Sequence, residues 1–177
     1  MISKAQVGTA ELDRRAAFAQ LVDRDLDRAY RLAGVILGSA ADAEDATHDA
    51  VVQAWRAFAG LRDTTRFEAW FQRILVNVCR DRLRKRRRSP VTELTMAGSS
   101  ATADWFSGVE DRLVLDRAFE SLRPEQAITL VLRFHADLTL EDVAARLGVP
   151  VGTVKSRLHS GLAALERALT GAEVIDR

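Results

Sequence analysis

The chain has 177 residues, of which 47% are apolar, and a formal net charge of +1, so one ordinary domain or two small ones can bury a core. Its single cysteine excludes an internal disulfide and a zinc site built from cysteines. Neither a signal peptide nor a run of about 18 apolar residues is evident, so we expect a cytoplasmic protein with no membrane insertion.

A helical repeat of apolar residues runs through most of the sequence, and only three prolines interrupt it. This pattern predicts an all-α fold. We expect the first ten residues to be frayed and the first helix to run from about Leu12 to Leu37, with a break, if there is one, near Asp23 to Asp25. Gly38 then ends the helix.

The second predicted helix carries a cluster of acidic residues. Ser39 and Asp42 have the spacing of a capping box and predict a helix that reaches about Phe58. Between Asp42 and Asp49 there are four acids and no lysine or arginine. A charge so unevenly distributed indicates separate surfaces for separate partners.

The third predicted helix follows a loop from Gly60 to Arg66. Thr65 and Glu68 offer a second capping box at its start. Helical spacing turns Trp70 and Phe71 inward, so we expect these rings to belong to the core. The loop itself is the expected place to hold a base extruded from a nucleic acid.

The third helix ends in a dense run of basic residues, with seven in the nine positions from Arg80 to Arg88. Such a run would neutralise several phosphates and bind nucleic acid in a salt-dependent way. The alternative is a solvated helix end, which the helix dipole also favours. The density of charge favours nucleic acid, with the arginines positioning the backbone because they carry no base code.

Residues 89–108 contain proline, glycine and serine without an apolar repeat, and we predict a flexible linker there. A helix is predicted from Val109 to Leu122, and Pro124 at a first helical position begins the next one. The prediction is therefore two small helical domains, residues 10–88 and 109–170, on either side of a linker.

The sequence from Leu140 to Leu158 predicts a helix-turn-helix in which Gly148 ends the first helix. The second helix has an apolar stripe, formed by Val154, Leu158, Leu162 and Leu165. Its opposite face carries short or basic side chains that can reach phosphates and base edges: Thr153, Lys155, Ser156, His159 and Ser160. An ordinary antiparallel helix pair is the alternative, and DNA binding is the favoured interpretation.

Two separate blocks of this sequence resemble one known family. Residues 42–55 (DAEDATHDAVVQAW), 67–77 (FEAWFQRILVN) and 81–87 (DRLRKRR) resemble domain two of the extracytoplasmic-function (ECF) sigma factors of bacterial RNA polymerase. Residues 122–126 (LRPEQ) and 148–159 (GVPVGTVKSRLH) resemble domain four of the same family. The resemblance implies a factor that directs promoter-specific transcription initiation, in a stress or envelope response.

The resemblance also implies roles for individual residues in the first domain. The acidic helix would bind core RNA polymerase through Asp42, Glu44, Asp45, Asp49 and Gln53, with Val51, Ala54 and Trp55 packed inward. The minus-ten promoter element would be held by the loop and the basic helix, through Arg62, Asp63, Thr64, Arg66, Asn77, Arg80, Arg84 and Lys85.

In the second domain, the minus-thirty-five element would be read or flanked by Thr153, Lys155, Ser156, Arg157 and His159. Many members of the family are held inactive by an anti-sigma factor, which makes such a protein a candidate partner. One departure from the family is Gly161, a helix-weakening residue that the pattern places near the DNA, so we expect modest affinity from this domain.

No enzyme, cofactor or metal site is predicted. His48 lies between Asp45 and Asp49, and a solvated salt pair is favoured there over a metal ligand. Cys79 is interpreted as a small apolar filler, with an exposed redox role as the alternative. Two rival functions stay open: a stand-alone helix-turn-helix regulator that binds an operator as a dimer, and a module that sequesters polymerase or another sigma factor.

Overall fold

A computed structural model of the chain describes residues 4–88, 115 and 117–173. Within these ranges every regular element is helical, as predicted from the sequence. The N-terminal half consists of α1 (Lys4–Leu37), α2 (Ala40–Ala57), the short 3-10 turns η1 (Phe58–Gly60) and η2 (Thr64–Arg66), and α3 (Phe67–Arg88). The C-terminal half consists of α5 (Pro124–Leu130), the π-helical turn η5 (Val131–His135), α6 (Leu140–Leu147) and α7 (Val151–Glu173).

The predicted linker lies outside the described residues, as does half of the helix predicted from Val109 to Leu122. Residues 117–121 are helical, which agrees with the C-terminal part of that prediction.

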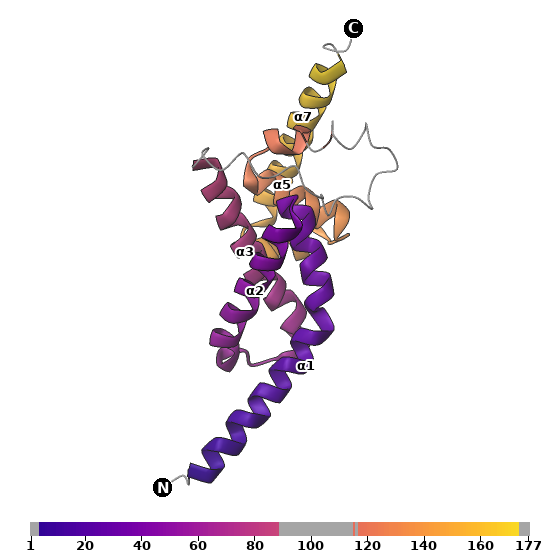
Figure 1. Cartoon of the computed structure of the whole chain (residues 1–177). Coiled ribbons are helices and arrows are strands. Elements are labelled where there is room, and N and C mark those ends of the chain that lie inside the picture. Colours follow the sequence, from indigo (N-terminus) through magenta and orange to yellow (C-terminus); the bar gives the residue numbers. More distant parts are fainter. Residues whose placement is uncertain (1–3, 89–114, 116, 174–177) are drawn as a thin grey trace.

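Helix α1 is continuous from Lys4 to Leu37, so it has no break near Asp23 to Asp25, and the predicted fraying is wrong for residues 4–10. Residues 1–3 lie outside the described residues. The Asp25 side chain is buried, and the Arg24 guanidinium donates to it over 3.0 Å, so its charge is compensated without a break in the helix. Gly38 ends α1 in the left-handed conformation, with φ of +69°. The first part of α1 projects from the body of the molecule (Figure 1).

Helix α2 packs closely because its inward face is made of alanines. Ala43, Ala46, Ala50 and Ala54 are completely buried. The helix begins as predicted, because Ser39 Oγ accepts a hydrogen bond of 3.2 Å from the Asp42 backbone N–H. Helix α3 lies beside it, and the three helices α1, α2 and α3 contact one another.

The start of α3 differs from the sequence prediction. Asp63 caps the turn η2 that precedes α3: its Oδ1 accepts hydrogen bonds from the Thr65 backbone N–H at 3.0 Å and from the Thr65 hydroxyl at 2.5 Å. Thr65 is thereby drawn into the turn η2, and the predicted capping box with Glu68 does not form. Behind this turn Phe67 and Phe71 are completely buried and stack with a centroid distance of 5.6 Å.

The C-terminal half contains the predicted helix-turn-helix. Pro124 is the first residue of α5, and Gln126 Oε1 accepts a 3.0 Å hydrogen bond from the Arg123 N–H. Thr139 caps α6 by accepting from the Asp142 N–H over 3.1 Å. Gly148 ends α6 with φ of +65°, as the left-handed stop requires.

The inward stripe of α7 is not the one predicted. Leu162 is 47% exposed, whereas Gly161 is buried and faces α5. An ideal Cβ on Gly161 would lie 3.1 Å from Leu130 Cδ1, so the missing side chain allows α7 to approach α5 closely. Gly161 therefore serves helix packing, and the modest affinity of this half for DNA stays a prediction.

The two halves are in contact, which the sequence did not indicate. Helix α3 of the first half packs against both α5 and α6 of the second. Leu132, Val143 and Leu147 belong to the same continuous cluster of buried side chains as Phe71 and Leu75. Figure 1 shows the C-terminal half seated at one end of the N-terminal bundle, with α7 extending away from it. The described residues of the two halves therefore share a core.

Candidate nucleic-acid interface and acidic face

The acidic face lies on the outer side of α2. Glu44, Asp45, Asp49 and Gln53 are exposed, and Asp42 is half-buried beside its cap. Asp49 Oδ2 lies 2.6 Å from Arg82 Nη2 of α3, and Asp45 Oδ2 lies 3.6 Å from Arg82 Nη1. Two of the five acidic-face residues therefore pair with the basic helix within the chain.

The residues of α2 that were predicted to pack inward differ in how far they are buried. Ala54 is completely buried, while Val51 and Trp55 are half-buried. The Trp55 ring packs edge-on against Phe18 at a centroid distance of 5.2 Å. The Arg14 guanidinium lies over the same ring, 4.5 Å from its centroid.

A groove between α1 and α2 was not predicted from the sequence. It encloses about 370 Å³ and is lined by Val22, Leu26, Asp27, Tyr30, Glu44, Thr47, His48 and Val51. Apolar side chains form most of its floor, and Asp27 and Glu44 contribute carboxylates to its lining. Tyr30 was the residue in the sequence that could have indicated this groove, because it is a large side chain on the first helix and it is 38% exposed in the structure.

The loop before α3 is exposed except at Leu61, which is half-buried. Arg62, Asp63, Thr64 and Arg66 are all exposed, as a site for an extruded base requires. Hydrogen bonds from the Thr65 hydroxyl and backbone N–H hold the pKa of Asp63 below its usual value, so this carboxylate is charged at neutral pH. The neighbouring rings mostly belong to the core, as predicted: Phe71 is buried and Trp70 is half-buried.

The basic run on α3 is exposed at its C-terminal end, but several of its arginines already have partners. Arg84 Nη2 lies 2.5 Å from Glu125 Oε1 of α5. Arg86 donates to the Leu37 carbonyl over 3.1 Å, and Arg87 donates to the carbonyls of Glu120 and Leu122. These contacts hold part of the positive charge within the protein.

Two other predicted DNA-binding residues of α3, Asn77 before the basic run and Arg80 at its start, are half-buried. Burial by itself raises the pKa of Glu125, but the hydrogen bond from Arg84, a backbone hydrogen bond and the positive charges of Arg84 and Arg157 together outweigh it and leave this pKa below its usual value. The Glu125 carboxylate is therefore charged near neutral pH.

The reading face of the helix-turn-helix is open to solvent. Lys155, Ser156 and His159 are exposed, and Thr153 and Arg157 are half-buried. Val154 on the opposite side is completely buried, so the first turns of α7 are fixed against the core. Ser160 is tied to α5 instead, because Gln126 Nε2 donates to its Oγ over 3.0 Å.

Comparison with known proteins identifies the family of this chain. The family Sigma-70 region 2 matches residues 21–89, and the family Sigma-70, region 4 matches residues 118–167. The ECF RNA polymerase sigma factor SigM of Mycobacterium tuberculosis is 36% identical over 155 residues, which cover 88% of this chain and 78% of SigM. The chain belongs to the ECF RNA polymerase sigma factors.

A second relative covers almost the whole chain. The ECF RNA polymerase sigma factor SigW of Bacillus subtilis is 28% identical over 182 residues, which cover 96% of this sigma factor and 97% of SigW. Two solved structures are also similar. The sigma factor RpoE in complex with the anti-sigma factor NepR from Bartonella quintana has a TM-score of 0.65 at 25% identity, covering 86% of this chain and 96% of its own. CnrH in complex with the cytosolic domain of CnrY has a TM-score of 0.60 at 25% identity, and the match covers 89% of this chain and 90% of the CnrH chain.

In this sigma factor the two matched regions are in direct contact. Arg84 belongs to region 2 and Glu125 to region 4, so their ion pair joins the regions. The acidic face and the loop lie in region 2 and the reading face lies in region 4, which places the expected sites for the two promoter elements in different halves of the molecule.

Cys79 is a filler of the sigma factor core, as predicted. Its side chain is completely buried, and burial raises the pKa of the thiol to about 12. A thiol so rarely ionised and so inaccessible does not suit the alternative of an exposed redox sensor. Over the described ranges, no helix is both long and apolar enough to cross a membrane.

Proposed function

We propose that this sigma factor binds core RNA polymerase through the acidic face of α2 together with the groove beside it. The observation that carries the proposal is that the acidic face and the groove form one continuous surface, because Glu44 belongs to both. An apolar groove with a carboxylate rim suits a partner helix that presents an apolar side chain and flanking basic residues. Asp42, Glu44, Asp45, Asp49 and Gln53 are the proposed contacts.

The minus-ten element is assigned to the loop and to the basic helix. Arg62, Asp63, Thr64 and Arg66 stand exposed beside α3, which supports the capture of an unpaired base there. Asn77, Arg80, Arg84 and Lys85 extend this surface along the helix, and the basic members would hold the phosphates.

The minus-thirty-five element is assigned to the exposed first turns of α7. Lys155, Ser156 and His159 would face the major groove, with Thr153 and Arg157 at the edge of the contact. Five side chains on one helix make a small surface, so the affinity of this half alone for DNA should be weak. Stable promoter binding then depends on both halves acting together on the polymerase.

The domain assignment extends the two matched regions. We assign residues 10–88 to the polymerase and minus-ten functions, 89–108 to the linker, and 109–170 to the minus-thirty-five function. The protein would carry out no catalysis of its own and would act with the polymerase in the cytoplasm.

An anti-sigma factor is the proposed regulator, in a stress or envelope response. One of the two similar solved structures is the sigma factor RpoE in complex with the anti-sigma factor NepR, and the other is CnrH in complex with the cytosolic domain of CnrY. The groove between α1 and α2 is a surface that a regulator could cover and so exclude the polymerase.

Sequencing of transcripts after overproduction of the protein tests the proposal. We expect a set of induced transcripts whose upstream regions share two short motifs at a constant spacing, one for each DNA-binding surface. Induced genes that share one palindromic motif would instead support the dimeric regulator. Gel filtration gives the matching check, because that rival requires a dimer with two equivalent half-sites.

A further inference from the structure

A cavity lies where α1 and α3 face the π-helical turn η5. It encloses about 400 Å³ and is lined by Arg28, Arg31, Leu32, Gln72, His135 and Ala136. Two of these side chains are guanidinium groups and a third is an imidazole, whereas none of the six carries a carboxylate, so we call it the basic cavity. The groove between α1 and α2 has the opposite character, with Asp27 and Glu44 in its lining. The basic cavity therefore suits an anionic ligand.

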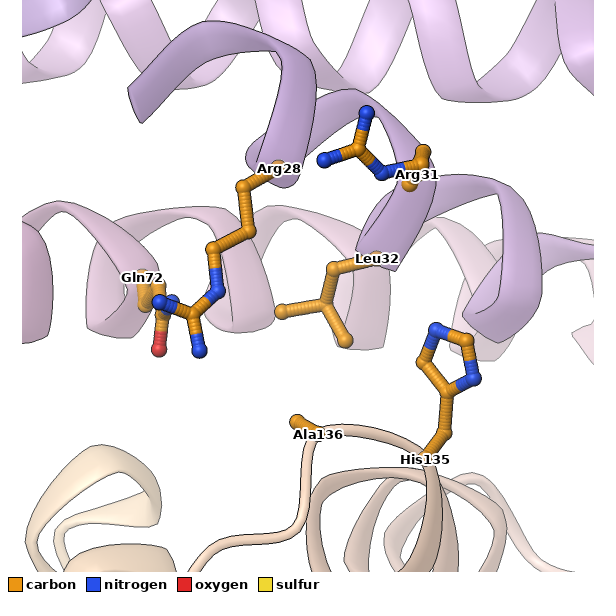
Figure 2. A pocket seen from close by; sticks show the side chains of 6 residues that line it. All are labelled: Arg28, Arg31, Leu32, Gln72, His135 and Ala136. Atoms are coloured by element: carbon orange, nitrogen blue, oxygen red, sulfur yellow. The ribbon is translucent and has the colours of Figure 1, made fainter. Parts of the chain in front are cut away.

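The nitrogen-bearing side chains reach the basic cavity from two sides. Arg28 and Arg31 are three residues apart on α1, so they lie on one face of that helix. Figure 2 shows both side chains extending from α1 and the His135 ring pointing toward α1 from the opposite side. Burial lowers the pKa of His135, and the positive charge of Arg31 lowers it further, so Arg31 acts on this ring across the cavity. An anion bound between the two groups would offset that repulsion.

The two arginines differ in how much charge they offer a ligand. Arg28 Nη1 lies 2.5 Å from Glu68 Oε1, so a carboxylate already compensates this guanidinium. Arg31 is exposed and has no carboxylate partner in the part of the chain that the structure describes. Arg31 therefore supplies the uncompensated charge, and the other N–H groups of Arg28 can still donate to an oxygen of the same ligand.

The inner wall of the basic cavity is fixed in place and partly apolar. Leu32 is 4% exposed and Gln72 is 3% exposed. The Gln72 amide is held at both ends, because its Oε1 accepts from Arg146 Nε over 2.6 Å and its Nε2 donates to Glu68 Oε1 over 3.2 Å. Gln72 is thus a wall of the cavity, and Leu32 and Ala136 offer apolar surface to an uncharged part of a ligand.

We propose that the basic cavity binds a small phosphorylated ligand, with its phosphate on Arg31 and Arg28 and its uncharged part against Leu32 and Ala136. The planar fork of a guanidinium matches the oxygens of a phosphate and binds them with two parallel hydrogen bonds. The volume of the cavity is that of a small-molecule site, whereas the surfaces assigned to DNA are open faces. The proposal concerns the free chain and is independent of the polymerase and the promoter.

Isothermal titration calorimetry of the full chain tests the proposal, with adenosine diphosphate and glucose 6-phosphate as separate probes and sulfate as the reference anion. We expect at least one probe to bind about tenfold or more tighter than sulfate, because its uncharged part adds contacts with Leu32 and Ala136. The tighter of the two distinguishes a nucleotide from a sugar phosphate as the ligand. If neither probe binds more tightly than sulfate, the proposal is wrong.

Substitutions in the lining separate the basic cavity from the rest of the surface. Arg31→Gln removes the uncompensated charge at an exposed position and should weaken the tighter probe by about tenfold or more. Arg56→Gln makes the same change at an exposed position of α2 and is the matched control. Ala136→Met keeps every charge but fills part of the cavity, and it should also weaken that probe. Equal affinities for Arg31→Gln and Arg56→Gln would contradict the proposal.

The three histidines of the chain report where the probe binds. His135 lines the basic cavity, His48 lines the groove between α1 and α2, and His159 is exposed on the reading face of α7. We expect the tighter probe to shift the imidazole NMR signals of His135, which His135→Gln identifies, and to leave those of His48 and His159 unchanged. Shifts confined to His159 would place the phosphate on the DNA-reading face and overturn the proposal. Equal shifts at all three rings would indicate an adventitious ion only and would overturn it as well.

Discussion

At the residue scale, Gly161 shows how a side chain's role depends on what lies opposite it. Its buried Cα faces Leu130, whereas its neighbour Leu162 is 47% exposed. Helical spacing alone predicts that Leu162 is buried, because a large apolar residue is expected to face the core and a glycine is not. In the structure α5 and α7 pack so closely that Gly161 faces the core and Leu162 faces solvent.

We predict that Gly161→Leu destabilises the protein by about 1–3 kcal/mol, since the added side chain must force α7 away from Leu130. Urea denaturation followed by circular dichroism measures the free energy of unfolding. Leu162→Ala is the matched control and should change it by less than about 1 kcal/mol, because that side chain is half in solvent. Equal losses for the two variants would show that Leu162, and not Gly161, faces the core.

A second prediction at this scale concerns His135, which lines the cavity between the halves. Burial lowers the pKa of His135, and the positive charge of Arg31 lowers it further. The unfolded chain therefore takes up a proton at higher pH than the folded chain does, and this contribution to stability is lost as the pH falls through about 6.5 and below.

Denaturation at pH 7.5 and at pH 5.5 checks this prediction. The loss of unfolding free energy between the two values should be smaller in His135→Gln than in the wild type, because the carboxylates contribute equally to both chains. An equal or larger loss in the variant would contradict the assigned direction of the pKa shift.

At the element scale, α2 and α7 each divide their surface between the core and a binding face. The alanines of α2 leave its acids on the outside, and the buried Val154 of α7 leaves Lys155 and His159 on the outside. Each helix therefore supports one proposed contact that can be removed without disturbing the packing behind it.

For α2, we predict that Glu44→Arg weakens binding to core polymerase by about tenfold or more, because it places a positive charge in the groove where a basic partner is expected. Glu141→Arg makes the same change at an exposed position of α6 and serves as the control. Titration of fluorescent protein with core polymerase gives both dissociation constants. Equal values for the two variants would remove the groove from the proposed interface.

For α7, we predict that Lys155→Ala reduces affinity for the promoter in the assembled holoenzyme and lowers the slope of log K against log salt by about one. Arg167→Ala, farther along the same helix and exposed, should leave both quantities unchanged. Binding measured between low and moderate salt provides the slope. An unchanged slope in Lys155→Ala would place this lysine away from the phosphates.

At the scale of the whole molecule, the sequence predicted the features that depend on local chemistry. Gly38, the Ser39 cap and Gly148 behave as expected, because each acts on residues within four positions. The start of α3 was mispredicted for the same kind of reason, since Asp63 reaches the Thr65 N–H before Thr65 can cap the helix. Two capping residues that compete within three positions cannot be ranked from spacing alone.

The contact between the halves could not have been predicted in this way. Gln72 and Arg146 are 74 residues apart, and neither belongs to a pattern that marks it as a partner of the other. The assignment of Arg84 to DNA likewise ignored Glu125, which pairs with it in the structure. Pairing between residues far apart in the sequence depends on how whole helices pack. The sequence therefore predicted the candidate surfaces, but it did not predict the contacts between the two halves.

The central claim is that two DNA-binding surfaces act together when mounted on core polymerase. Run-off transcription with purified core polymerase and this protein, on templates carrying the promoters of genes induced by its overproduction, tests the claim most directly. The account predicts a discrete promoter-specific product that requires both proteins and is reduced by Glu44→Arg and by Lys155→Ala. A wild-type protein that yields no promoter-specific product on any of these templates would contradict the account.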